Sequence, residues 1–166
     1  MLYLFLVRRP LENIGFTFNL SSNDLKQALL GLTAFSLVGL PLGLAFGFLR
    51  YLPDIPTIGD ALVMLLAGYL LTALIEEVLF RGLIQNLPTK RLGKFNQALP
   101  IAAVIFGLAH INNSTPRFDV PNLGYALIAA LVGAAYGWVW WRTKKVTASA
   151  ITHALVSFVW GVLFIG

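Results

Sequence analysis

Two adjacent glutamates, Glu76 and Glu77, are the residues of this sequence whose type and spacing are best suited to chemistry. They follow an apolar run over residues 61–75, and Arg81 lies four residues after Glu77. An ionisable side chain in a membrane-spanning helix is costly to bury and is a functional-site hypothesis by default. The sequence therefore predicts a functional acid that is buried in a membrane helix.

Helical geometry gives the two carboxylates different partners. Residues four apart share a helix face, whereas neighbours point about 100° apart. Glu77 and Arg81 therefore face the same side, and we expect an ion pair that neutralises a buried charge and supports the helix. Glu76 points away from this guanidinium and is suited to act as a general base. The structural alternative is a hydrogen bond from Glu76 to a helix backbone or a serine.

The two histidines of the chain, His110 and His153, lie in two other apolar runs. An imidazole hydrogen-bonded to Glu76 could share its proton and hold a water molecule between the two groups. Ser157 follows His153 by four residues, so both could donate hydrogen bonds to a developing oxyanion. Each also has a structural alternative, because a membrane serine usually bonds its own backbone and a histidine can bridge two helices. We predict a catalytic site built from these four side chains.

A metal site is the rival interpretation of the same residues. Glu76, His110 and His153 would provide three ligands for a divalent ion such as Zn²⁺. The His-Glu-x-x-His spacing that places two ligands on one helix face does not occur in the sequence. Three separate helices would have to supply the ligands, so we favour a site without a metal or other cofactor.

The composition indicates the solvent in which these side chains lie. Of the 166 residues, 58% are hydrophobic and only 11% are charged, and the mean hydropathy is +0.79. A soluble domain of this length cannot bury so much apolar surface, so the sequence predicts an integral membrane protein. Without cysteine, the chain has no disulfide and no cysteine nucleophile. Its net charge of +5 comes from dispersed basic residues, so we expect no nucleic-acid partner.

Five apolar stretches are candidates for membrane spans and predict an all-α, polytopic helical bundle. A helix needs roughly 20 residues to cross a bilayer, and only the third stretch is clearly short. Residues 1–20 are expected to form an amphipathic segment at the membrane interface, because their apolar start is followed at once by Arg8 and Arg9. We expect a single membrane-embedded domain over residues 1–166. The five stretches cover residues 25–49, 61–85, 99–110, 123–141 and 148–165.

Basic residues alternate along the connections between these spans. Three lie at the start of the chain, three follow the second span and three follow the fourth, whereas the first and third spans are each followed by one arginine. By the positive-inside rule, the N-terminus is cytoplasmic and the C-terminus lies outside. We expect a multi-pass protein of a bacterial-type cell membrane.

Three short motifs follow one another in successive apolar stretches. They are E-E-V-L-F-R over residues 76–81, F-G-L-A-H over residues 106–110 and H-A-L-V-S over residues 153–157. In type and order they resemble the CPBP family of CAAX proteases and bacteriocin-processing enzymes, also called Abi, which are relatives of the type II CAAX prenyl endopeptidase. The resemblance covers the chain from roughly the first span to its end.

The resemblance implies an intramembrane endopeptidase whose cavity opens toward the cytoplasm. By position, Glu76 matches the catalytic glutamate and His110 the histidine that helps it to activate water. His153 and Ser157 match an oxyanion pair, although the family commonly has asparagine or aspartate at the second position. Glu77 and Arg81 match a supporting ion pair. Family members are often labelled metalloproteases, but the glutamate mechanism requires no metal.

The sequence thus favours hydrolysis of peptides or membrane-protein segments by a glutamate-activated water. The alternative is a catalytically silent membrane protein of the same fold, such as an immunity or scaffold component, and the serine at position 157 gives it some weight. A transporter that uses Glu76 as a proton carrier is disfavoured, because the chain has short connections and no repeated halves.

Overall fold

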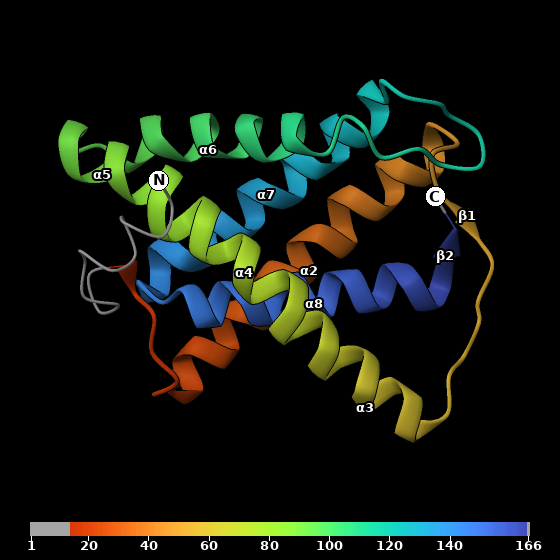
Figure 1. Cartoon of the computed structure of the whole chain (residues 1–166), viewed down its shortest axis with the longest axis horizontal. Coiled ribbons are helices and arrows are strands. Elements are labelled where there is room, and N and C mark those ends of the chain that lie inside the picture. The colour runs from red at the N-terminus through yellow and green to blue at the C-terminus, as the bar shows by residue number, and fades with distance from the viewer. Residues whose placement is uncertain (1–13, 166) are drawn as a thin grey trace.

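The computed structural model describes residues 14–165, which are almost entirely helical (Figure 1). Residues 1–13 of the predicted interfacial segment lie outside the described residues. Residues 15–20 form neither helix nor strand, and they run beside the start of the last helix. There the Val146 amide donates a hydrogen bond of 2.8 Å to the Gly15 carbonyl.

Each of the five predicted spans corresponds to a helical segment of the structure. Four are long and apolar enough to cross a membrane. The third span is the short helix α6, whose 15 residues extend about 22 Å, less than the roughly 30 Å of a bilayer core. The single-segment helices are α2 (Ser22–Ala45), α6 (Phe95–Ala109), α7 (Leu123–Thr143) and α8 (Val146–Leu163). The structure is therefore an all-α polytopic bundle.

The second span is a continuous helical segment that begins at Ile58, and its hydrogen-bond pattern changes along its length. Two stretches have the wider π-helical turn, and the single α-helical turn between them ends at Glu77. Turns of this kind are rare and concentrate at functional sites. The segments in order are α3 (Ile58–Ala67), η2 (Gly68–Ala73), α4 (Leu74–Glu77), η3 (Val78–Gln85) and α5 (Asn86–Leu92).

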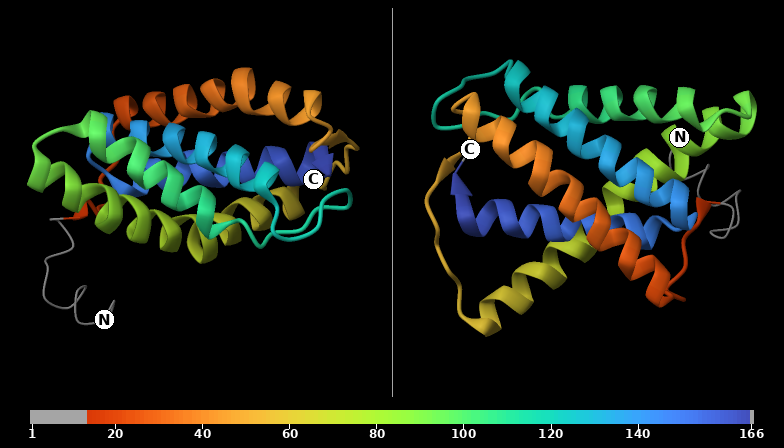
Figure 2. Two further views of the ribbon diagram at one scale, coloured as in Figure 1. Left: turned by 90° about the horizontal axis from the view of Figure 1, so that it is seen from above. Right: turned by 180° about the vertical axis from the view of Figure 1, so that it is seen from behind.

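The helices form three layers, which Figure 2 displays from above. Helices α7 and α8 lie in the middle. Helix α2 covers one side, and the long second span lies with α6 on the other. Two short strands, β1 (Arg50–Tyr51) and β2 (Phe164–Ile165), pair antiparallel at the end of the bundle where the chain finishes.

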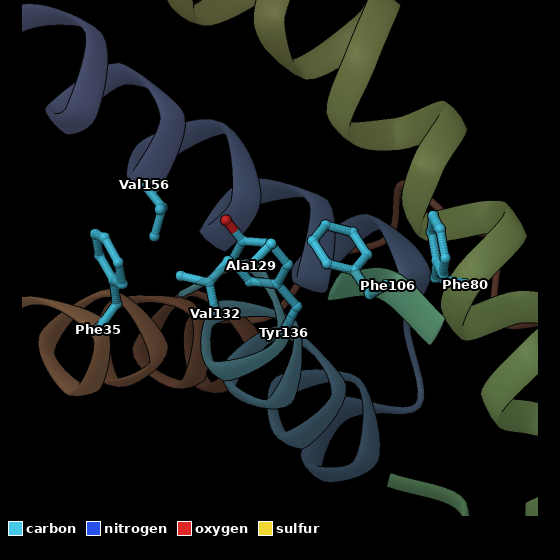
Figure 3. Close-up of a cluster of buried hydrophobic side chains, with 7 residues drawn as sticks. All are labelled: Phe35, Phe80, Phe106, Ala129, Val132, Tyr136 and Val156. Atoms are coloured by element: carbon cyan, nitrogen blue, oxygen red, sulfur yellow. The ribbon is translucent and has the colours of Figure 1, made fainter. Parts of the chain in front are cut away.

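The buried core joins all three layers beside the second span, which contains Glu76 and Glu77 (Figure 3). Its cluster contains side chains from α2, η3, α6, α7 and α8, namely Phe35, Phe80, Phe106, Ala129, Val132, Tyr136 and Val156. The ring of Phe106 packs edge-on against Phe80 with centroids 4.7 Å apart. This packing fixes α6 and the second span relative to each other.

Helix α6 approaches α7 closely at Gly107. A Cβ atom at this position would lie 2.4 Å from the Ala126 carbonyl oxygen and 2.8 Å from Ala130 Cβ. Only a residue without a side chain permits this approach. Because α6 ends at Ala109, the contact also sets the position of His110, the residue that caps the helix.

Candidate active site

The predicted ion pair between Glu77 and Arg81 is present in the interior of the bundle. Arg81 Nε lies 2.9 Å from Glu77 Oε2, and neither side chain is exposed at all. The hydroxyl of Ser149 on α8 donates a second hydrogen bond to the same carboxylate oxygen. Glu77 is therefore an ionised carboxylate whose charge is fully compensated by its neighbours.

His153 is the third donor to Glu77. Its Nδ1 lies 3.2 Å from Glu77 Oε1. A carboxylate that is paired with arginine can only accept hydrogen bonds, so His153 Nδ1 carries a proton. The other nitrogen, Nε2, then faces Glu76 from 4.0 Å. His153 thus contacts both glutamates, one with each ring nitrogen.

His110 is held by its own helix. Its Nδ1 lies 2.7 Å from the Phe106 carbonyl oxygen, which can only accept, so this nitrogen also carries a proton. Its Nε2 lies 3.7 Å from Glu76 Oε2. The ring packs at an angle of 32° against Phe106, with centroids 4.5 Å apart, and lies parallel to the ring of Tyr125 at 6.1 Å. These contacts orient Nε2 toward the acid.

Glu76 differs from its neighbour in having no donor of its own. Its side chain is 29% exposed. Its Oε2 is buried, and among the described residues no protein group makes a hydrogen bond to it. The two imidazole Nε2 atoms lie beyond direct hydrogen-bond range, at a separation that suits a shared water molecule. The structure therefore brings Glu76, His110 and His153 together.

A cavity of about 190 Å³ adjoins this cluster between α6, α7 and α8. Both histidines line it, together with apolar side chains of α7 and the indole of Trp160. Ser157 also lines the cavity, and it is exposed. In the described part of the chain, no hydrogen bond joins Ser157 to His153. The residue predicted as the second oxyanion donor therefore lies at the cavity but is not held in position.

The rival metal interpretation concerns the same residues. Among residues 14–165, no group of three or more histidine, aspartate or glutamate side chains has the arrangement of a metal site. Glu77, the other carboxylate of the cluster, is occupied by its three donors. The preference for a site without a metal stays a prediction.

Sequence reasoning did not identify Ser149, Tyr136 or Gln85 as parts of this site. Gln85 accepts a hydrogen bond of 3.2 Å from Arg81 Nη1 and donates one of 3.0 Å to the Gly137 carbonyl. The spacing contained part of the signal, because Ser149 lies four residues before His153 and Gln85 four after Arg81. Tyr136 gave no such signal, since no motif residue shares its helix.

The comparison with protein families agrees with the geometry. Residues 58–159, which contain all the predicted site residues, match the family model described as "Type II CAAX prenyl endopeptidase Rce1-like". The match covers more than half of the chain. This protein belongs to the Rce1-like family of CAAX-type endopeptidases. Together with its four long apolar helices, the family identifies an integral membrane protease. No curated protein and no solved structure matches the chain significantly.

Proposed function

We propose that this chain hydrolyses peptide bonds within the bilayer by means of a water molecule that Glu76 and His110 activate. The observation that carries the proposal is the buried Oε2 of Glu76, which lacks a hydrogen-bond donor but faces two imidazole Nε2 atoms at 3.7 and 4.0 Å. A general base needs this combination of an available lone pair and a nearby place for water.

Glu76 begins the reaction as a carboxylate. It removes a proton from the water while the water oxygen forms a bond to the carbonyl carbon of the scissile peptide. The electron pair of the carbonyl double bond moves onto its oxygen and forms the oxyanion of a tetrahedral intermediate. His110 Nε2 accepts a hydrogen bond from the other hydrogen of the water and so orients the attack.

The intermediate then collapses with Glu76 as the general acid. The oxyanion re-forms a carbonyl, the bond from carbon to nitrogen breaks, and the leaving amine takes the proton that Glu76 had removed from water. The products are a carboxylic acid and an amine, and Glu76 is again a carboxylate. The cycle is balanced without a metal or an oxidant.

His153 supports the oxyanion in this proposal. Because its Nδ1 proton is committed to Glu77, its Nε2 can donate only when the imidazole is cationic. His153 thus contributes a charge-assisted hydrogen bond during the part of the cycle in which it is protonated.

The decisive experiment is Glu76→Gln in the purified full chain. Its substrate is a quenched fluorescent, farnesylated peptide with a CAAX carboxyl terminus, the class that the family name indicates. The amide cannot accept a proton from water, so we expect turnover to fall by at least about 1,000-fold while thermal unfolding in detergent stays unchanged. Asp54→Asn, in the exposed connection before α3, is the matched control and should keep full activity.

Unchanged turnover by the Glu76→Gln protein would refute the proposal. A wild-type protein without activity, whose effect on cells survives Glu76→Gln, would instead support the catalytically silent alternative. Treatment with a metal chelator is a further arm of the experiment. We expect turnover to survive chelation, and its loss and recovery with added Zn²⁺ would contradict the metal-free mechanism.

A further inference from the structure

The proposed site is short of permanent hydrogen-bond donors for the oxyanion. The Nδ1 protons of both histidines are directed at protein acceptors, His110 toward the Phe106 carbonyl and His153 toward Glu77. Their Nε2 atoms donate only in the cationic form. Ser157 has a short side chain and is exposed. An oxyanion forming in this cavity would therefore benefit from a neutral donor with a longer reach.

Tyr136 on α7 places such a donor at the cavity. Its side chain lines the cavity although the residue is only 1% exposed. Its ring stacks on the imidazole of His153, with centroids 4.5 Å apart and an interplanar angle of 18°. The phenolic oxygen reaches from α7 toward α8 (Figure 3). The hydroxyl is thus on the same side of the site as the proposed oxyanion residue.

Among residues 14–165, no side chain or backbone group forms a hydrogen bond with the hydroxyl of Tyr136, and the residue lines the cavity. A phenolic hydroxyl can donate one hydrogen bond, so this donor is available to a group that enters the cavity. A phenylalanine would fill the same space but would offer no donor. A ligand that enters the cavity and presents an acceptor oxygen would satisfy the hydroxyl.

The backbone of Tyr136 is fixed to the catalytic network. Its carbonyl oxygen lies 3.0 Å from the hydroxyl oxygen of Ser149, the residue that also bonds Glu77. The ring packs edge-on against Phe106 at an angle of 89°. With its ring held on two sides, the phenol loses little conformational entropy when it binds a ligand. A donor that is fixed before the reaction stabilises charge most effectively.

We infer that Tyr136 is a catalytic residue whose hydroxyl donates a hydrogen bond to the carbonyl oxygen of the scissile peptide and to the oxyanion formed from it. The inference rests on the proposed peptidase function. It assigns the second oxyanion donor to α7, a helix that contains none of the three motifs, and gives Ser157 no more than an accessory part.

The test is Tyr136→Phe, which removes one oxygen atom and keeps the ring. We expect kcat on the farnesylated peptide to fall about 100-fold, the typical effect of losing one oxyanion donor, with KM changed less than about threefold. A peptidyl phosphonate that imitates the tetrahedral intermediate should bind about 100-fold more weakly. Tyr51→Phe, on an exposed strand outside the cavity, is the matched control and should match the wild type.

Several outcomes would overturn the inference. A Tyr136→Phe protein with kcat within twofold of the wild type would do so, provided that Glu76→Gln is inactive in the same assay. A rise in KM of about 100-fold with an unchanged kcat would also overturn the inference. It would indicate that Tyr136 contacts the substrate equally in the ground state and in the transition state. Activity in both variants would instead remove the proposed function itself. If Tyr136→Phe does not fold, 3-fluorotyrosine at position 136 provides a second variant, and an unchanged kcat with this more acidic phenol would count against the inference.

Discussion

Glu76 and Glu77 occupy successive positions of one helix, yet their environments are opposite. Glu77 is completely buried and accepts hydrogen bonds from Arg81, Ser149 and His153. Glu76 is 29% exposed, and its inner oxygen has no donor among the described residues. The two residues are both glutamates, so their surroundings and not their residue type make them different. The roughly 100° between neighbouring side chains is enough to separate a fully paired carboxylate from the one that we propose as the general base.

His153 connects the two environments. Its Nδ1 is bonded to the structural carboxylate, while its Nε2 faces the reactive one at 4.0 Å. Glu77 therefore keeps the proton on Nδ1. In the proposed mechanism, only the protonation of Nε2 changes during the reaction. In this mechanism, the buried ion pair therefore acts on the reaction only through His153.

The largest expected effect on stability comes from breaking the structural half of the comparison. Glu77→Gln leaves Arg81 as a buried cation without a counter-ion, and removing one partner of a buried pair costs about 3–5 kcal/mol. We expect a strongly lowered free energy of unfolding in detergent, measured by denaturant titration. Glu76→Gln should leave that free energy within about 1 kcal/mol of the wild type.

A double-mutant cycle tests whether the loss arises from the uncompensated charge. The Glu77→Gln, Arg81→Met double variant has no buried charge at either position, so it should recover part of the stability that each single variant loses. Simple additivity of the two single losses would contradict the assignment of a structural ion pair. Equal destabilisation by Glu76→Gln and Glu77→Gln would contradict the claim that only Glu77 stabilises the fold.

The fold and the principal residues could be predicted from the sequence because both depend on local patterns. Apolar runs of sufficient length predict helices in a bilayer, and the four-residue spacing of Glu77 and Arg81 predicts their ion pair. The positions of Glu76, His110 and His153 along their own apolar runs predicted that these three side chains could meet. Four of these helices are indeed long and apolar enough to span a membrane, and the short third helix was foreseen.

Other features depend on contacts between helices and could not be predicted. The π-helical turns lie on both sides of the α-helical turn that contains Glu76, and no pattern of residues in the sequence predicts them. Ser149 and Tyr136 matter through the neighbours that the fold gives them. A serine and a tyrosine in apolar helices have common structural explanations when only the sequence is known. The geometry is needed to separate them from the many similar residues in the chain.

An intermediate effect is expected for Ser149→Ala, which removes one of the three donors to Glu77. The hydroxyl is completely buried, so its loss leaves the carboxylate and the Tyr136 carbonyl less satisfied, at a cost of about 1–3 kcal/mol. Because Glu77 positions His153, we also expect kcat to fall about tenfold. Denaturant titration and a peptide-cleavage assay measure these two effects.

A conservative variant and a control variant test whether the effect of Ser149→Ala comes from its hydrogen bond to Glu77. Ser149→Cys retains a weak donor of similar size and should recover part of the activity. Thr33→Ala removes a hydroxyl that bonds only its own helix backbone at 2.9 Å, and it should leave cleavage and unfolding unchanged. A Ser149→Ala protein that loses stability but keeps the wild-type kcat would restrict Ser149 to a structural part.

The smallest effect is expected at a third buried carboxylate, Asp24. Its cationic partner is partly exposed, whereas the partner of Glu77 is fully buried. Asp24 is only 4% exposed, but its partner Lys145, at 2.7 Å, is 25% exposed and remains hydrated when the pair is lost. Asp24→Asn should therefore cost only about 1 kcal/mol in unfolding free energy and leave cleavage unchanged. Asp60→Asn, at the exposed start of α3, serves as the control. A loss at Asp24 as large as that at Glu77 would mean that burial of the carboxylate alone sets the cost. A loss several-fold smaller would mean that the cost depends on whether the cation left behind can reach water.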